Sequence, residues 1–371
     1  MLGLALALSG CVANPVAPAP ALTTGAASAS TAPPAGTIAP RPAATPTAPP
    51  PTTRLRVATQ RLATDAALYI AQERGYFAEQ GLDVGFEDIT TGQGSIPPLA
   101  AGQLDVGVGA VSAGLFNAIA RGIDIKLVAT KGSVGTDPHG AFVGPMALVL
   151  SADAAASGAI QDYGDLRGRS VALGERGAAM ELMLDKAIEP SGLTSNDLDF
   201  KLMPYPDMVV ALANGSVDAA MELEPFVAQG TARGALRRWK TAPELYPGQQ
   251  SATVAYGPTM QQLGQDVGGR FMVAYTRGLR DYQDAFGPKQ RDRAAVVAIL
   301  IANTALKDPA LYDQMALAYL NPDCYLNVDA MVADLEWYAA NGYVPQKPDL
   351  VQAVDNTYCD HAIQQLGRYQ P

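Results

Sequence analysis

Histidine and cysteine, the usual ligands of zinc, are scarce in this chain. Its 371 residues include only two histidines, His139 and His361, and neither Cys324 nor Cys359 has the short spacing of metal ligands. A zinc site needs several His or Cys side chains at regular intervals. The sequence therefore predicts no metal site, and its candidate chemistry is the binding of a small molecule by polar groups.

The polar residues suited to this task follow predicted strands. The charged ones are mostly carboxylates: Asp65, Glu175, Glu222 and Glu224, against Arg61 and Arg176. An anion site shows clustered Arg or Lys, or free N–H groups with no carboxylate nearby. These carboxylates favour a neutral or weakly basic ligand. The net charge of −10, with no basic stripe, also argues against nucleic acid as a partner.

Strands alternate with helices from residue 54 onward. The first series comprises predicted strands at 55–59, 82–86, 105–109, 125–129 and 147–150 and helices at 65–74 and 112–121. The alternation restarts at residue 170, and beyond residue 257 the pattern is mostly helical. This order indicates an α/β fold with largely parallel sheets. We predict two lobes, the first from residues 54–150 and 252–371, the second from residues 151–251.

A cleft between the lobes is the expected binding site, because ligands bind beyond the carboxyl ends of strands in open α/β sheets. The candidates in the first lobe are Gln60, Asp65, Tyr69, Gly94, Ser95, Ala110 and Ser112. Those in the second lobe are Gly174, Arg176, Tyr205, Glu222 and Glu224, and hinge strands are expected near Ala147 and Tyr256. A flat ring could stack on aromatic residues near the cleft: Tyr69, Phe116, Tyr205, Phe226 and Tyr256.

Several candidates also have a plainer interpretation. Residues 92–95 could be a simple loop that ends in a helix cap, and Arg176 could be a solvated surface charge. Glu224 could complement the dipole of the helix that follows Pro225. His139 lies in a loop that could dip towards the cleft or stay in solvent. Each aromatic residue, taken alone, could belong to the core.

The N-terminus reads as an export signal. The apolar run at residues 2–8 ends in Ser9-Gly10-Cys11 and is too short to cross a bilayer. This ending resembles the lipobox of bacterial lipoproteins, whose cysteine is acylated; the alternative is a chance cysteine. We expect a signal peptide at residues 1–10, lipid attachment at Cys11, and a location on the extracytoplasmic face of the cell membrane.

Two further expectations concern the exported protein. Residues 11–53 are mostly Ala, Pro, Thr and Ser, which cannot build a core, so they form a linker between the anchor and the folded part. Cys324 and Cys359 remain as an even pair in an oxidising compartment. We predict a disulfide between them, the alternative being two buried thiols.

Four motifs, in order, carry a family resemblance. They are YIAQERGYFAEQGLDV (69–84), LAAGQLDVG (99–107), DLRGRSVA (165–172) and ANGSVDAA (213–220), the last running on to Glu224 and Pro225. Together they resemble the sulfonate, nitrate and thiamine-precursor family of ABC-importer solute-binding proteins. The resemblance implies the two-lobed type II periplasmic-binding-protein fold with a discontinuous first lobe. It also implies a monomer without cofactor or catalysis, whose partners are an ABC permease and its cytoplasmic ATPase.

The ligand is the least determined feature. The chain is most similar to the riboflavin-binding branch of the family, so we expect a heteroaromatic vitamin, with riboflavin first. In thiamine-precursor binders a Glu near position 224 faces the ligand, which favours Glu224 as a contact. The alternatives are a thiamine pyrimidine precursor, nitrate, or a sulfonate or taurine-like anion. A sensing lipoprotein is a further alternative; a pyrimidine synthase is disfavoured because its cysteine-rich signature is missing.

Overall fold

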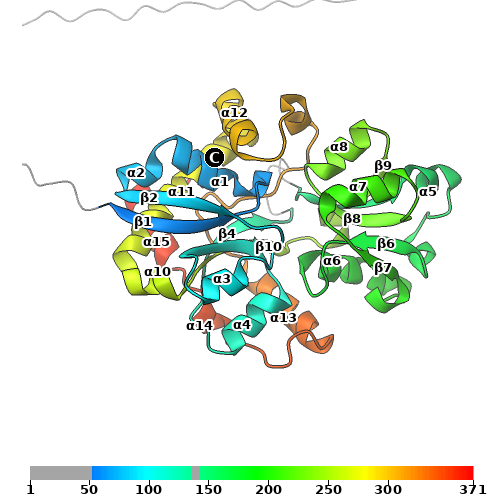
Figure 1. Cartoon of the computed structure of the whole chain (residues 1–371), viewed down its shortest axis with the longest axis horizontal. Coiled ribbons are helices and arrows are strands. Elements are labelled where there is room, and N and C mark those ends of the chain that lie inside the picture. Colours follow the sequence, from blue (N-terminus) through cyan, green and yellow to red (C-terminus); the bar gives the residue numbers. More distant parts are fainter. Residues whose placement is uncertain (1–51, 136–142, 371) are drawn as a thin grey trace, which may run out of the picture. The chain divides into compact units, whose positions relative to one another are not determined.

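The computed structural model describes residues 52–135 and 143–370. The expected signal peptide, Cys11, nearly all of the expected linker, and His139 lie outside these residues. No helix in the described ranges is long and apolar enough to span a membrane. The described chain forms two α/β lobes, each built on a five-stranded sheet (Figure 1).

Lobe 1 is built on a mixed sheet. Its strands are β1 (Thr53–Thr59), β2 (Leu82–Asp88), β3 (Val106–Ala110), β4 (Lys126–Ser133) and β10 (Gln250–Tyr256), in the order β2-β1-β3-β10-β4. β1 runs parallel to β2 and β3, whereas β10 is antiparallel to both of its neighbours. The apolar residues of β1, β3 and β4 are almost completely buried, except Ala110 at the end of β3, as expected for strands covered on both faces.

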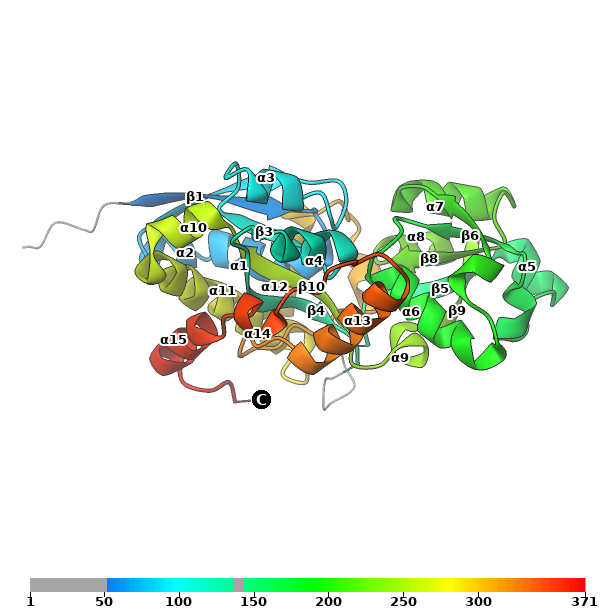
Figure 2. The ribbon, with the colours of Figure 1, turned by 90° about the horizontal axis from the view of Figure 1, so that it is seen from below.

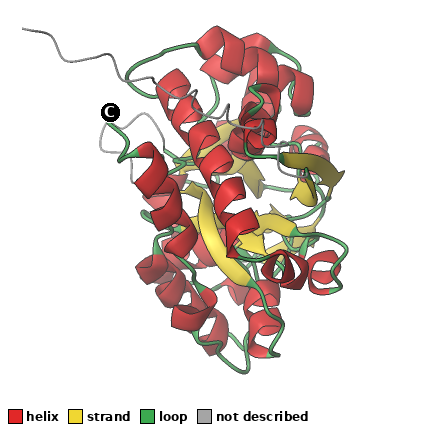
Figure 3. Ribbon diagram, turned by 90° about the vertical axis from the view of Figure 1, so that its left-hand side faces the viewer, coloured by secondary structure: helices red, strands yellow, loops and turns green. Residues whose placement is uncertain are grey.

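Helices cover this sheet on both faces (Figure 2, Figure 3). Those that alternate with the strands are α1 (Ala66–Glu73), α2 (Tyr76–Glu79), α3 (Ile96–Ala100) and α4 (Ala113–Ala120). Those from the C-terminal part are α10 (Pro258–Leu263), α11 (Gln265–Phe286), α12 (Arg293–Asn303), α13 (Val328–Ala340), α14 (Leu350–Ala353) and α15 (Thr357–Leu366). The C-terminal segment therefore completes lobe 1, and it is mostly helical, as the pattern beyond residue 257 predicts.

Lobe 2 repeats the arrangement. Its strands are β5 (Met146–Ser151), β6 (Ser170–Leu173), β7 (Asp199–Leu202), β8 (Ala219–Leu223) and β9 (Leu236–Thr241), in the order β7-β6-β8-β5-β9. β5 is the antiparallel strand. The helices are α5 (Ala152–Ser157), α6 (Ala179–Ile188), α7 (Tyr205–Ala213), α8 (Phe226–Ala232) and α9 (Ala242–Leu245). Separate apolar clusters fill the two faces of this sheet.

The passage between the lobes differs from the expected one. The predicted bounds assign the strand at residues 147–150 to the first lobe, but β5 pairs with β8 and β9 in the second sheet. The lobes are joined where β4 leads to β5 and where β9 leads to β10. Every residue of β5 is buried, and such a uniformly apolar strand does not reveal its sheet from sequence alone. Tyr256, expected near a hinge, lies at the far end of β10 in the core of lobe 1.

One disulfide closes the C-terminal part of lobe 1. It joins Cys324 to Cys359, with the Cα atoms 5.9 Å apart and a separation of 35 positions in sequence. Both residues are completely buried. The bond ties the segment before α13 to α15.

Candidate functional site

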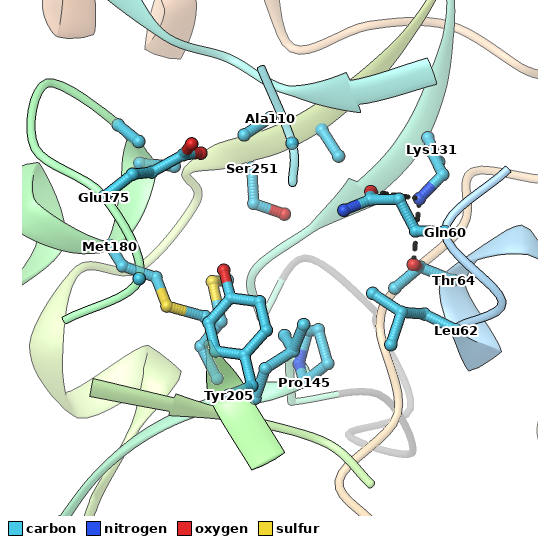
Figure 4. Close-up of a pocket in the computed structure, with 17 residues that line it drawn as sticks. Gln60, Leu62, Thr64, Ala110, Lys131, Pro145, Glu175, Met180, Tyr205 and Ser251 are labelled. Atoms are coloured by element: carbon cyan, nitrogen blue, oxygen red, sulfur yellow. Dashed lines mark hydrogen bonds between the residues drawn. The ribbon is translucent and has the colours of Figure 1, made fainter. Parts of the chain in front are cut away.

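The two lobes face each other across a cleft formed at one edge of each sheet. The carboxyl ends of parallel strands and the amino ends of β5 and β10 meet there, around a small inner chamber of about 60 Å³ (Figure 4). The lining residues are Gln60, Leu62, Thr64, Gly92, Ala110, Lys131, Ser251 and Ala252 from lobe 1, and Pro145, Met146, Gly174, Glu175, Ala178, Ala179, Met180, Tyr205 and Leu223 from lobe 2 or the passage into it.

Lys131, on β4, is the centre of a polar cluster in the lobe 1 wall. Its side chain is 2% exposed, and Nζ lies 3.0 Å from Asp65 Oδ1. The same Nζ donates to Thr64 Oγ1 at 3.0 Å and to Gln60 Oε1 at 3.4 Å. The lysine thus makes two hydrogen bonds, to Thr64 and Gln60, and an ion pair with Asp65. Asp65 balances the charge of the lysine.

Asp65 also fixes the loop that follows β1. Its Oδ2 accepts hydrogen bonds from the backbone N–H groups of Gln60, at 2.9 Å, and Leu62, at 3.1 Å. Arg61, between them, adopts the left-handed conformation with φ of 55°. The backbone is thus held on both sides of this turn. The Gln60 side chain reaches the cleft with its amide nitrogen on the cavity side (Figure 4).

The lobe 2 wall is mostly apolar. Met146, Met180 and Leu223 line it, and the ring of Tyr205 stands among them with its hydroxyl directed into the chamber (Figure 4). Gly174 makes room for that ring, because a Cβ there would lie 3.1 Å from the Tyr205 ring. This wall therefore offers a flat aromatic surface beside flexible thioethers, which suits a planar ligand.

Glu175 is the only carboxylic side chain among the described residues that line the inner chamber. Its carboxyl group points into the cavity from the lobe 2 side (Figure 4). Burial raises the pKa of Glu175, and hydrogen bonding to Gln93 and Thr91 offsets part of that rise. A carboxyl group in this environment can donate when protonated, or accept from a ligand N–H when ionised.

The cleft continues into a second, outer hollow. It shares Gln60, Leu62, Gly174, Glu175 and Tyr205 with the inner chamber. Its further lining residues are Ile89, Thr90, Thr91, Leu202, Met203, Pro204, Pro206, Phe226 and Ala305. The outer hollow encloses about 580 Å³, a volume typical of small-molecule sites, so most of the space for a ligand lies there, with the inner chamber as its deeper end.

Four of the predicted residues line the inner chamber: Gln60, Ala110, Gly174 and Tyr205. Phe226, one of the proposed stacking residues, lines the outer hollow. The other aromatic candidates belong to lobe 1. Tyr69 packs edge-on against Phe86, with ring centroids 5.3 Å apart, Phe116 contacts Tyr338, and the Tyr256 hydroxyl donates to the Gly268 carbonyl oxygen. They are core residues, because their helices and strand turn these side chains into the packed interior.

Apart from Glu175, the charged candidates Glu222, Glu224 and Arg176 bond within the protein and are not among the lining residues. Glu224 pairs with Arg238 and accepts from the Ala316 backbone N–H. Arg176 pairs with Glu181, at 2.7 Å. Glu222 is completely buried and accepts from the adjacent backbone N–H, and burial raises its pKa. The acidic cleft expected from the sequence therefore reduces to Glu175.

The remaining candidates hold local structure. Ser112 caps α4 by accepting from the Leu115 backbone N–H at 3.3 Å. Ser95 is buried at the start of α3, in lobe 1, and the Gly94 backbone N–H donates to the Thr91 carbonyl oxygen. These contacts match the plainer interpretation of residues 92–95 as a loop that leads into a helix.

Sequence reasoning missed the lysine on which the lobe 1 wall depends. Lys131 lies in a strand, KLVATKGS, whose residues from Leu127 to Ser133 are all buried. A charged residue inside an otherwise buried strand is rarely left unpaired. That signal could have marked Lys131 before the structure was known, but it could not have named Asp65 as the partner.

A protein-family model matches this chain. The NMT1/THI5-like model matches residues 63–281, more than half of the chain. The chain belongs to the NMT1/THI5-like family. Among curated proteins no sequence matches it.

Solved structures agree with this membership of the NMT1/THI5-like family at the level of the fold. The alkanesulfonate-binding protein SsuA from Xanthomonas axonopodis pv. citri superimposes with a TM-score of 0.65 at 18% identity, covering 82% of this chain and 99% of that one. The nitrate-binding protein NrtA from Synechocystis PCC 6803 gives 0.68 at 15% identity, covering 86% and 90%. This NMT1/THI5-like chain therefore has the two-lobed periplasmic-binding-protein fold, and the predicted fold class is confirmed.

Proposed function

We propose that this chain is the extracytoplasmic solute-binding lipoprotein of an ABC importer. The observation that carries the proposal is the cleft itself, a mostly apolar chamber in which both lobes contribute a few convergent polar groups. Lobes joined by two connections can close on a ligand that binds better in the closed state. A permease would then receive the ligand from the closed form, with a cytoplasmic ATPase driving import and no reaction catalysed by this chain.

The proposed ligand is a heteroaromatic vitamin, with riboflavin as the first choice. Tyr205 and the methionines beside it supply a surface for a flat ring, while Gln60 and Glu175 face that ring from opposite lobes. The outer hollow leaves space for a substituent, and Thr90 and Thr91 place hydroxyl-bearing side chains along it. A ring that carries both carbonyl and N–H groups, with a hydroxylated tail, complements this distribution.

A small anion is the second candidate. The solved SsuA and NrtA structures are described as alkanesulfonate-binding and nitrate-binding proteins. In this chain the first residues of α6, Ala179 and Met180, line the chamber, and helix N-termini favour anions. Two features oppose an anion here: Asp65 neutralises Lys131, and Glu175 faces the same space.

Lipid anchoring at Cys11 and the linker over residues 11–53 stay predictions. Lipid attachment predicts that the protein, expressed with its N-terminus, incorporates a labelled fatty acid and that the Cys11→Ser variant does not. Unchanged membrane association of the Cys11→Ser protein would remove the anchor from the proposal and leave the binding role intact.

The first experiment on the ligand is a flavin binding assay. Purified protein is mixed with riboflavin, freed of excess by gel filtration, and examined by visible absorption and flavin fluorescence. A retained yellow chromophore with shifted bands and quenched fluorescence supports a flavin carrier. A colourless protein removes riboflavin, and calorimetric titration with the thiamine pyrimidine precursor, nitrate, taurine and methanesulfonate then decides among the alternatives.

A variant pair locates the binding site. Tyr205→Ala removes the ring that lines the chamber, whereas Tyr163→Ala removes a ring that packs on Trp239 elsewhere in lobe 2. We expect Tyr205→Ala to weaken binding about tenfold or more and Tyr163→Ala to leave it unchanged. Equal effects of the two variants would place the ligand outside this cleft.

A further inference from the structure

The hydrogen-bond roles of the lobe 1 wall follow from the buried lysine beneath it. Lys131 Nζ faces Gln60 Oε1 and Thr64 Oγ1, both of which belong to residues that line the cleft. An ammonium group has donors but no acceptor. The Gln60 carboxamide must therefore turn its oxygen to the lysine, which leaves the amide nitrogen for the cavity, and the nitrogen lies on that side in Figure 4.

The same argument applies to Thr64. Its hydroxyl oxygen accepts from Lys131 at 3.0 Å, so the hydroxyl proton is available to donate elsewhere. Ser251, on the same wall, instead donates to the Gly132 carbonyl oxygen at 2.9 Å. The lobe 1 wall thus presents donors at Gln60 and Thr64, and the lysine that orients them is itself paired with Asp65.

We propose that Lys131 is a positioning residue that fixes Gln60 as a hydrogen-bond donor, so that the cleft selects a ligand with a carbonyl or ring-nitrogen acceptor at the edge facing lobe 1. Lys131 acts through Gln60 and does not contact the ligand. The inference rests on the proposed function, because it assumes that this cleft holds the solute.

The charge balance of the cluster supports a neutral acceptor over an anion. Lys131 and Asp65 are both almost completely buried and lie 3.0 Å apart, so an anion would have to compete with the carboxylate for the ammonium. A carbonyl oxygen or ring nitrogen needs only the donors that Gln60 and Thr64 already present. Glu175, on the opposite wall, complements an N–H or weakly basic group. The selected class is therefore a ring with acceptors on one edge and donors on another.

The test is a double-mutant cycle with riboflavin as the probe. Lys131→Met is combined with Asp65→Asn, because the pair removes both buried charges while the Asn oxygen can still accept from the Gln60 and Leu62 backbone. The second change is Gln60→Leu, made alone and together with that pair. Lys126→Met, at the other, half-buried end of β4, is the matched control, and thermal unfolding verifies that each variant is folded.

We expect Gln60→Leu to weaken binding about tenfold. The double variant Lys131→Met/Asp65→Asn should weaken binding by a similar factor, and adding Gln60→Leu to this double variant should cause no further loss. Additive losses would mean that Lys131 contributes independently of Gln60 and would overturn the inference while leaving the binding role in place.

Analogues of riboflavin give a readout that general loosening of the protein would not move. The 2-thio and 4-thio analogues replace one carbonyl acceptor at a time by a weaker thiocarbonyl acceptor. Wild type and Lys126→Met should discriminate against at least one analogue, and both Gln60→Leu and the Lys131/Asp65 pair should lose that discrimination. Discrimination that persists in Gln60→Leu would overturn the inference.

Two outcomes separate this inference from the proposed function. If riboflavin fails but the thiamine pyrimidine precursor binds, the same cycle is run with that ligand, whose ring nitrogens are the acceptors. Nitrate or methanesulfonate could bind instead, with binding abolished in the Lys131→Met/Asp65→Asn variant but kept in Gln60→Leu. Lys131 would then contact the anion directly, and the inference would fail while the proposed function stands. If no probe binds wild type, the proposed function and the inference fail together.

Discussion

Lobe 1 and lobe 2 have the same sheet topology but build different walls for the cleft. The strand order is β2-β1-β3-β10-β4 in lobe 1 and β7-β6-β8-β5-β9 in lobe 2. The two orders correspond strand by strand, and the antiparallel strand, β10 or β5, is the fourth in each sheet. The lobe 1 wall contains a buried ion pair, Lys131 with Asp65, that organises neighbouring polar groups. The lobe 2 wall consists of apolar side chains, one aromatic ring and Glu175. One topology can therefore carry a wall built around a buried ion pair on one side and a mostly apolar wall with one carboxyl group on the other.

The largest expected effect follows from breaking the ion pair of lobe 1. Lys131→Met leaves the Asp65 carboxylate buried and unpaired, and we expect a loss of about 3–5 kcal/mol in the free energy of unfolding. Urea denaturation measures it. Lys126→Met, whose partner Asp124 is exposed, should cost less than about 1 kcal/mol. A similar cost for both lysines would show that the cluster does not distinguish the lobe 1 wall.

The fold was more predictable than the site, for a physical reason. The alternation of strands and helices depends on local periodicity, so two α/β lobes and the helical C-terminal part could be inferred from the sequence. Sheet membership depends on partners far apart in the chain. For that reason β5 was placed in the wrong lobe, although its residues were correctly predicted to form a strand.

The site shows the same limit more strongly. The rule that ligands bind at strand ends identified the loops of Gln60, Gly174 and Tyr205, which line the cleft. It could not tell which side chains in those loops would be neutralised from elsewhere. Asp65 pairs with Lys131, which lies on β4, far away in sequence. Glu224 pairs with Arg238, which lies on β9, the edge strand of the lobe 2 sheet.

The second prediction concerns the seam where the lobes meet. Asp334, on α13 of lobe 1, is completely buried; burial raises its pKa to about 7, and the neighbouring Tyr246, Gln249 and Lys186 offset only part of the rise. The folded protein then holds a proton that the unfolded chain releases near pH 4. The protonated Asp334 contributes its full stability below about pH 4, and this contribution is lost as the pH rises through about 7. The free energy of unfolding should fall by at most about 4 kcal/mol over this range.

Asp334→Asn should remove this pH dependence. Urea denaturation of wild type and variant at pH 5 and pH 8 checks it, with Asp329→Asn, in the first turn of the same helix, as the control. If the free energy of unfolding falls equally between pH 5 and pH 8 in wild type and in Asp334→Asn, Asp334 is not the group whose titration causes the fall.

The disulfide adds a smaller difference between the lobes, because the only disulfide among the described residues lies in lobe 1. Closing a loop of this length restricts the unfolded chain, so Cys324→Ser with Cys359→Ser should cost about 2–4 kcal/mol. Thermal unfolding of the oxidised and double-variant proteins measures it. Ligand affinity should change little, because neither cysteine lines the cleft. A large loss of affinity would show that the lobe 1 wall depends on this bond.

The smallest effect is expected from the one carboxylic group of the lobe 2 wall. Burial raises the pKa of Glu175 above its ordinary value, so the stability it contributes is present at acidic pH and is lost as pH rises through the raised pKa. Glu175→Gln removes that loss and should raise the free energy of unfolding at pH 8 by less than about 1 kcal/mol, while Glu189→Gln, at the exposed C-terminal end of α6, should change nothing. Urea denaturation at pH 5 and pH 8 distinguishes the two. A stabilised protein with weakened ligand binding would mean that Glu175 is kept for the ligand and not for the fold. A destabilised one would make this carboxyl group structural, like Asp65, and the contrast between the two walls would disappear.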